Sequence, residues 1–221
     1  MSKRLLFEKT GNGVWISHLD LMRLYQRAFK RGGLNLKHTQ GFSPRAVVSI
    51  ALPLSVGVES KCEILDFKLV GQEGLSNEEI KSRLNATMPV GVRVRSVYDS
   101  DVKIKHLTHL ECVITLEYDS GVPEGAEEAI CALFARESVT VMKKGKNGLT
   151  EQDIIPMIRS AEVSRLSDQE LTVHAIVCAQ NPSLNPAQMV AAIETYCNEY
   201  KPDFAKIRRE EVLTSVGEVF R

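Results

Sequence analysis

The sequence lacks the cysteine patterns that bind metals or iron–sulfur clusters. It contains no CxxC pair and no CxxxCxxC arrangement. The five cysteines are widely spaced and mostly lie in apolar segments: Cys62, Cys112, Cys131, Cys178 and Cys197. Such a set is typical of buried thiols in a reducing compartment. We therefore expect no metal and no other cofactor in this chain.

Long apolar runs and targeting signals are missing as well. The longest apolar stretch, residues 46–58, contains serine, proline and glycine, and it is shorter than the roughly 18–20 residues that cross a bilayer. The chain begins with Met1-Ser2-Lys3-Arg4 and enters a strand-like segment directly, without the apolar core of a signal peptide. These features predict a cytoplasmic protein with no membrane partner.

Common catalytic signatures are also absent. The sequence contains no GxSxG, Walker loop, HExxH or glycine-rich dinucleotide motif. Three of the histidines, His106, His109 and His174, lie outside any carboxylate or cysteine pattern. These absences favour a chain without catalytic activity of its own.

The formal net charge of zero conceals an uneven distribution. Residues 1–50 contain nine Lys or Arg and two Asp or Glu, which gives +7, and the remaining 19 basic and 26 acidic residues give −7. A segment this basic indicates an anionic partner. The alternative is that the basic and acidic halves pack against each other.

Turn residues and apolar periodicity predict the elements of the first half. They are a strand at 4–8, a helix from His18 to Arg31 capped by Ser17, a short strand-like segment at 34–37, strands at 47–54 and 62–70, a helix opened by a capping box of Ser76 and Glu79, and a strand at 92–98. This order matches the split βαβ, ferredoxin-like pattern.

A polar link at 99–105 separates a second series of elements. They are a strand at 110–118, a helix at 125–137, a strand at 138–142, a turn at 143–148, a short helix near 151–158, strands at 160–166 and 170–178, a helix from 185, and a strand at 204–213. We predict an α+β fold of two ferredoxin-like units, each an antiparallel sheet with helices on one face. A basic domain would span 1–105 and an acidic domain 106–221.

The helix at 18–31 carries a basic outer stripe, which contains Arg23, Arg27, Lys30 and Arg31. At 1.5 Å per residue the stripe spans about 12 Å, and Asp20 is the only acid beside it. Arginine favours bidentate contacts with phosphate. The stripe therefore indicates either an anion-binding surface or a solvated helix face.

Further candidate binding residues surround this helix. At its first turn Ser17 is an N-cap, and His18 is either an anion donor, an acid or base, or a helix-start residue. The loop after the helix supplies Lys37, His38, Gly41, Phe42, Ser43 and Arg45. Phe42 either stacks on a base while Arg23 and Arg45 hold phosphates, or it fills the core. We expect the helix and the loop to form one positively charged pocket.

A series of motifs in residues 15–60 resembles the radical-SAM-linked protein family of unknown function. The motifs are Trp15 to Arg23 with its SHLD run, Arg27-Ala28 with Arg31, Gly41-Phe42-Ser43-Pro44, and Pro53 to Ser60. The family's loop more often has Asn where Ser43 stands. The likeness is strong over residues 3–100 and concerns mainly the layout beyond them.

The resemblance implies a partner. In this family the domain is fused to, or encoded beside, a cobalamin-binding radical-SAM protein. The iron–sulfur cluster, S-adenosylmethionine and cobalamin would then reside in the partner. We expect an accessory protein that presents RNA or another anionic substrate to that enzyme. Two alternatives stay open: a metal-independent RNA-processing enzyme that uses His18, and a protein–protein adaptor.

Overall fold

Strands and helices form two units in the computed structural model, which describes residues 2–145 and 148–221. One unit comprises the chain up to Ile104 together with Arg221, and the other comprises Lys105–Phe220. The division falls within the polar segment 99–105. No helix in the described ranges is long and apolar enough to cross a membrane.

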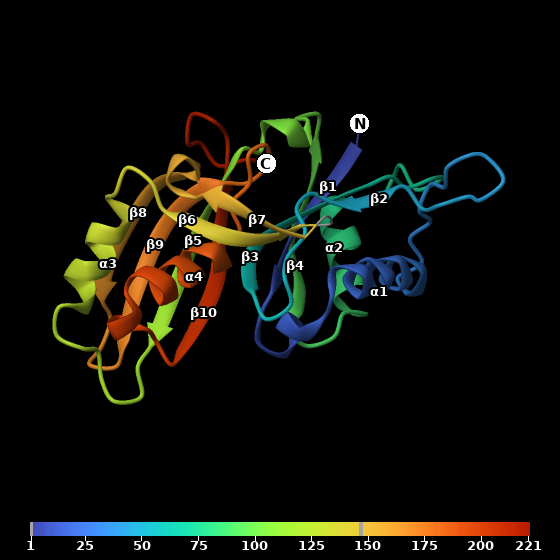
Figure 1. Cartoon of the computed structure of the whole chain (residues 1–221). Helices are drawn as coiled ribbons and strands as arrows, with labels where there is room; N and C mark the ends of the chain where they lie inside the picture. Colours follow the sequence, from blue (N-terminus) through green and yellow to red (C-terminus); the bar gives the residue numbers. More distant parts are fainter. Residues whose placement is uncertain (1, 146–147) are drawn as a thin grey trace. The chain divides into compact units, whose positions relative to one another are not determined.

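The first unit has ferredoxin-like topology (Figure 1). Its elements are β1 (Ser2–Lys9), the 3-10 helix η1 (Gly11–Trp15), α1 (His18–Arg31), β2 (Val48–Ile50), β3 (Glu59–Phe67), α2 (Asn77–Asn85) and β4 (Val92–Ser100). The strand order is β4-β1-β3-β2, and all neighbours are antiparallel. This is the split βαβ order that the sequence predicts.

Both helices of the first unit pack on one face of its sheet. Leu5 and Phe7 alternate along β1 toward the helices, where they meet side chains of α1 and α2 in a single core. The Phe7 and Tyr25 rings pack edge to face with centroids 4.9 Å apart. Phe29 and Phe67 pack at the same separation. The apolar stripe of α1 is therefore buried, and its basic stripe lies outside.

The second unit repeats this topology. Its elements are η2 (Ile104–His106), β5 (His109–Glu117), α3 (Ala126–Phe134), β6 (Thr140–Gly145), β7 (Gly148–Asp153), η3 (Ile155–Met157), β8 (Ile158–Arg165), β9 (Glu170–Cys178), α4 (Ala187–Tyr196), η4 (Asn198–Tyr200) and β10 (Phe204–Leu213). The order is β10-β5-β9-β8, and β6 and β7 form a separate hairpin. The prediction of two ferredoxin-like α+β units is confirmed.

Several predicted elements differ from the structure. The short helix near 151–158 is wrong, because 148–153 form β7 and only 155–157 are helical. Gln152 is held opposite Val141 of β6, and such nonlocal pairing overrides local helix preference. Of the predicted turn at 143–148, residues 143–145 belong to β6 and Gly148 to β7, while 146–147 lie outside the described residues.

In the first unit, segment 34–37 forms no strand. Leu36 makes an isolated bridge with Leu69, and His38 makes another with Ala46. The strand predicted at 47–54 is only Val48–Ile50. Residues 34–47 therefore form a long connection between α1 and β2.

Two glycines fix the entry of the chain into α1. The backbone of Gly13, in η1, lies against the backbone of Gly91, which precedes β4 and has a φ of +91°. A Cβ atom on Gly91 would lie 2.5 Å from the Thr10 carbonyl oxygen. The Thr10 N–H donates to the Gly91 carbonyl at 2.8 Å. This contact holds η1, and with it Trp15 and the start of α1, against the sheet.

Candidate functional site

The N-terminus of α1 is closed by its own side chains. The Ser17 hydroxyl accepts from the Asp20 N–H at 3.2 Å and donates to the Asp20 carboxylate at 2.8 Å. Arg23 donates to the same carboxylate at 2.9 Å. The Ser17 hydrogen bond, and then the one from Arg23, lowers the pKa of Asp20 below its usual value. Ser17 thus serves as the predicted N-cap, and Asp20 partly neutralises Arg23.

His18, the first residue of α1, is only half exposed. Its Nδ1 atom is buried and has no hydrogen-bond partner among the described residues. The ring therefore keeps one nitrogen inside the protein and does not present both nitrogens to a ligand.

The loop that contains residues 37–45 projects away from the sheet of its unit (Figure 1). The Thr39 N–H donates to the Arg45 carbonyl at 2.8 Å, and the Arg45 N–H donates to the Thr39 hydroxyl at 3.0 Å. These bonds close the base of the loop. Gly41, with a φ of +133°, and the exposed Ser43 lie at its tip.

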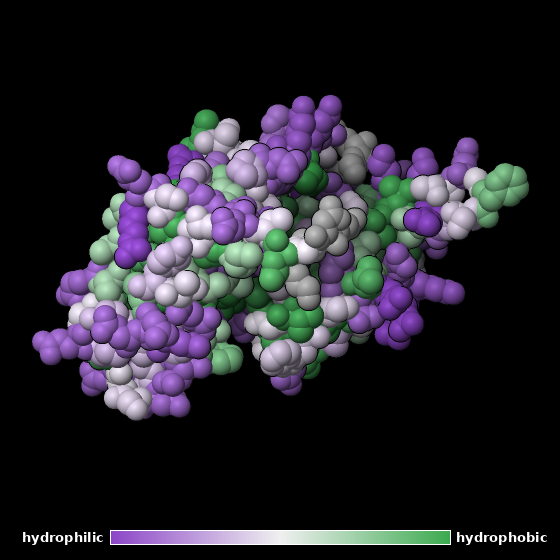
Figure 2. Space-filling model, viewed as in Figure 1, coloured by the Kyte–Doolittle hydropathy of each residue, from purple (hydrophilic) through white to green (hydrophobic). Residues whose placement is uncertain are grey.

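Phe42 lies fully exposed between them, with a relative accessibility of 112%. Figure 2 shows a hydrophobic group at the outermost point of this loop. The alternative that Phe42 fills the core is wrong, because the loop closes on itself before the side chain can reach the sheet.

Three arginines line a groove on one flank of α1. Arg23, Arg27 and Arg31 follow each other at four-residue intervals and face the segment Thr87–Pro89 across a volume of about 650 Å³. Each interval corresponds to about 6 Å along the helix axis. Ile16 and Leu24 supply apolar lining. This flank therefore presents a row of guanidinium groups.

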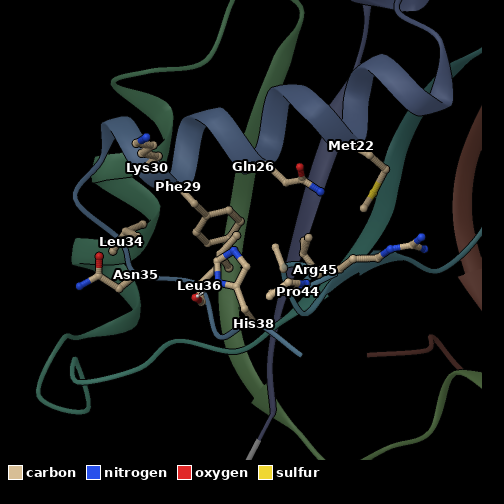
Figure 3. Close-up of a pocket in the computed structure, with 12 residues that line it drawn as sticks. Met22, Gln26, Phe29, Lys30, Leu34, Asn35, Leu36, His38, Pro44 and Arg45 are labelled. Carbon is tan, nitrogen blue, oxygen red and sulfur yellow. Dashed lines mark hydrogen bonds between the residues drawn. The ribbon is translucent and has the colours of Figure 1, made fainter. Parts of the chain in front are cut away.

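A second groove of about 740 Å³ lies on the opposite flank of α1 (Figure 3). From α1 it is lined by Met22, Gln26, Phe29 and Lys30, from the following connection by Leu34, Asn35, Leu36, His38, Pro44, Arg45 and Ala46, and from β2 by Val48. His38 lies below Phe29 in Figure 3, and its Nδ1 atom is 3.0 Å from the Leu36 carbonyl oxygen. Lys30 and Arg45 contribute the positive charge.

The single pocket that we expected is therefore two grooves. The helical period of 100° per residue places Met22 and Gln26 on one side of α1 and the three arginines on another. His38 and Arg45 face the side with Met22 and Gln26, so α1 separates them from the arginines. Lys37 is exposed but lines neither groove. Only Arg23 of these basic residues has an ion-pair partner within the described part of the chain. The remaining cations are Arg27, Lys30, Arg31, Lys37 and Arg45.

Sequence reasoning missed the exposed apolar residues beside the start of α1. Trp15 is 69% exposed, Leu19 67% and Val56 52%. The Trp15 ring lies beside the Gly57 turn, whose N–H donates to the Val14 carbonyl at 2.9 Å. The available signal was Leu19, an apolar residue on the polar side of the helical wheel.

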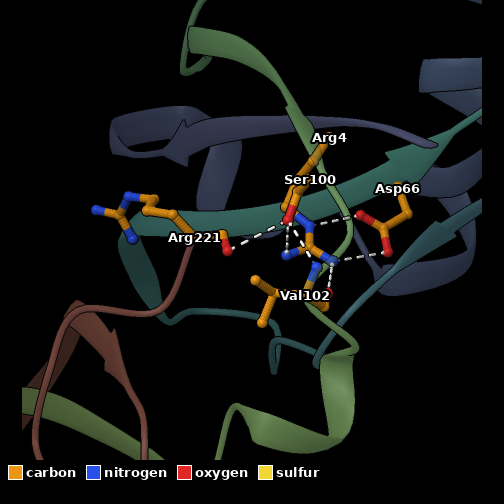
Figure 4. A network of polar contacts seen from close by, with 5 residues as sticks. All are labelled: Arg4, Asp66, Ser100, Val102 and Arg221. Atoms are coloured by element: carbon orange, nitrogen blue, oxygen red, sulfur yellow. Dashed lines mark hydrogen bonds and ion pairs between the residues drawn. The ribbon is translucent and has the colours of Figure 1, made fainter. Parts of the chain in front are cut away.

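Arg4 shows the contrasting case of a fully engaged guanidinium (Figure 4). Its side chain is 3% exposed and binds both Asp66 oxygens, at 2.6 and 3.1 Å. It also donates to the Ser100 hydroxyl at 3.1 Å and to the Val102 carbonyl at 2.9 Å. This network ties β1 to β3 and β4, and it is structural.

Metal chemistry finds no support in the described residues. No group of three or more His, Cys, Asp or Glu side chains there is arranged to hold a metal ion. Cys62, Cys112 and Cys197 are buried, Cys178 is partly buried and Cys131 is exposed, and all five are free thiols. Burial raises the pKa of Cys112 to about 12, which disfavours its thiolate form at neutral pH.

Comparison with known proteins adds a family and a fold. A family described as "Uncharacterized protein conserved in bacteria (DUF2344)" matches residues 3–186. No curated protein matches. Among solved structures, a chain of a Cbf5-Nop10-Gar1 complex is 10% identical with a TM-score of 0.52 over 95% of this chain and 48% of its own. A chain of the archaeal box H/ACA sRNP Nop10-Cbf5 complex is 10% identical, with a TM-score of 0.48 over 94% and 46%. The chain thus spans about half the length of these structures.

Proposed function

Because the chain belongs to this conserved bacterial family, DUF2344, whose description names no activity, we propose a function from the site itself. The protein is an accessory RNA-binding protein without catalytic activity of its own. It binds RNA through the outer surface of α1 and the 37–45 loop, and it presents the RNA to a radical-SAM enzyme. The enzyme part of the proposal depends on the motifs of residues 15–60.

The row of Arg23, Arg27 and Arg31 is the observation that carries the proposal. Guanidinium groups donate two parallel hydrogen bonds to phosphate. Arg27 and Arg31 have no ion-pair partner in the described residues, so their donors are available to a ligand. A row at about 6 Å intervals suits a chain of anions better than a single small anion.

The exposed Phe42 favours a nucleic acid over other polyanions. Aromatic side chains in basic surroundings stack on unpaired bases, and a base offers a π-face in every sequence. Arg45 and His38 lie near the base of the same loop. Phosphate contacts and base contacts are therefore both represented on this surface.

A salt titration with a matched control tests the RNA proposal. We expect the full chain to bind a labelled small RNA with an affinity that falls steeply with salt, because phosphate contacts release counterions. Arg27→Glu with Arg31→Glu should weaken binding and reduce the salt slope by about 1 for each lost phosphate contact. The control, Lys105→Glu with Arg165→Glu, changes the net charge equally at exposed positions of the other unit.

Two results would contradict this proposal. Equal weakening by both double variants would indicate a nonspecific charge effect, and unchanged binding by the α1 variant would show that this surface is not used.

The proposed protein partner requires its own experiment. We expect this chain to form a stable complex when it is purified together with a radical-SAM protein of the same organism, and the absence of such a complex would remove the enzyme from the proposal.

A further inference from the structure

Trp15 is a second exposed aromatic residue of the first unit, besides Phe42. The aromatic side chains in the core of this unit, Phe7, Tyr25, Phe29 and Phe67, are at most 1% exposed. Trp15 lies at the end of η1, where the Gly13–Gly91 contact holds the backbone against the sheet. An indole fixed in this exposed position is an apolar surface available to a ligand.

Trp15 lies just before α1, and Phe42 lies at the tip of the loop that follows α1. Leu19, Met22, Gln26 and Lys30 lie within about 80° of one another around the helix, and the last three line the second groove. The base of the loop that carries Phe42 supplies His38, Pro44 and Arg45 to the opposite wall of this groove. This side of the helix therefore combines apolar side chains with the cations Lys30 and Arg45.

Among the described residues, no aromatic side chain lines the groove on the opposite flank. Its groove is lined by Arg23, Arg27 and Arg31 and by the Thr87–Pro89 segment. The two flanks thus differ in chemistry: one suits phosphates, and the other suits flat apolar groups between cations. A double helix hides the faces of its bases, whereas an unpaired strand exposes them.

We infer that the ligand is single-stranded RNA, whose backbone follows the arginine flank while unpaired bases stack on Trp15 and Phe42. This inference depends on the proposed RNA binding and specifies the kind of RNA. Charge favours RNA over an apolar protein segment as the occupant of the Trp15 surface. Asp20 is the one acid of α1, and Arg23 already pairs with it.

The sole tryptophan of the chain is Trp15, so its fluorescence reports directly on this surface. We expect an unstructured 12-nucleotide RNA to quench the emission of the full-length protein at low salt. A duplex of the same length should bind through phosphates alone and leave the emission unchanged.

Substitutions separate stacking from phosphate binding. Trp15→Ala and Phe42→Ala should each weaken single-strand binding by roughly 5- to 150-fold, with an unchanged salt slope. Arg27→Glu should instead reduce the slope. Phe204→Ala, which removes an aromatic residue of the other unit that is 57% exposed, should bind as the unsubstituted protein does. Circular dichroism confirms that each variant is folded.

The outcomes distinguish this inference from the function on which it depends. If RNA binds with a steep salt dependence but Trp15→Ala and Phe42→Ala bind normally, the inference is wrong and the proposed function stands. Equal affinity for duplex and single strand without quenching also overturns it. Failure of every RNA to bind removes both. A change in Trp15 emission that only the radical-SAM protein produces would assign this surface to protein docking and overturn stacking on RNA.

Discussion

Replacing Arg4 by methionine tests how strongly the buried guanidinium stabilises the first unit. The substitution keeps much of the apolar stem and removes the charge. It leaves the Asp66 carboxylate, the Ser100 hydroxyl and the Val102 carbonyl without the donor that now binds them. The penalty therefore comes mainly from a carboxylate that loses its partner.

The expected magnitude follows from the burial of the two partners. Removing one member of a buried ion pair costs about 3–5 kcal/mol. Arg4 is 3% exposed, but the Asp66 side chain is 26% exposed, so water recovers part of its hydration. We expect the free energy of unfolding to fall by about 3 kcal/mol. With a denaturant slope of about 1–3 kcal/mol per molar, the urea midpoint should fall by about 1–3 M.

Urea unfolding followed by circular dichroism and by Trp15 emission measures this change, since Trp15 belongs to the same unit. The control is the double variant Arg4→Met with Asp66→Leu, which removes the orphaned charge. It should recover at least half of the lost stability, because apolar replacements of ion pairs are often near neutral. A loss below about 1 kcal/mol in the single variant, or no recovery in the double variant, would refute the reasoning.

Two further substitutions test the buried Tyr25 hydroxyl and the backbone contact between Gly13 and Gly91. The Tyr25 hydroxyl is buried without a hydrogen-bond partner in the described residues, so Tyr25→Phe should raise the free energy of unfolding by about 1 kcal/mol. Burial, and then the charge of Glu63, raises the pKa of Tyr25 well above 10.0. Below pH 10 the Tyr25 hydroxyl is protonated in both the folded and the unfolded protein. Above pH 10 the unfolded protein releases this proton first, so the free energy of unfolding falls as the pH rises. Tyr25→Phe should lack this alkaline loss in a pH series of urea melts. Gly91→Ala should cost about 2–3 kcal/mol, through its φ of +91° and the overlap with Thr10. Gly71→Ala, at a φ of +68° with open space around it, isolates the conformational part, and equal losses would contradict the overlap.

Elements with local signals could be predicted from the sequence. Helix α1 begins after the Ser17 cap and ends before Gly32, as predicted. The capping box of Ser76 and Glu79 is present in full, because both partners lie within one turn. The element β7 was misread because its strand character depends on pairing with β6, which no short window of sequence contains.

The candidate site was less predictable than the fold. The helical period places the arginines on the outer side of α1, and the structure agrees. It does not reveal that Thr87–Pro89 forms a wall beside Arg27 and Arg31, because that wall depends on how α2 ends. Hydrophobicity alone predicts burial for Trp15 and Phe42, whereas a backbone contact and a closed loop hold both in solvent.

In both units, the connection between the first helix and the second strand of the ferredoxin-like sheet is long. In the first unit it contains the 37–45 loop, and in the second it contains the β6–β7 hairpin. The strand that follows pairs with only one neighbour of its own unit's sheet. Extra length at this point therefore leaves the central strands in register. A tag or fluorophore can therefore be inserted in the connection of the second unit. Such an insertion would leave the 37–45 loop of the first unit intact for functional assays.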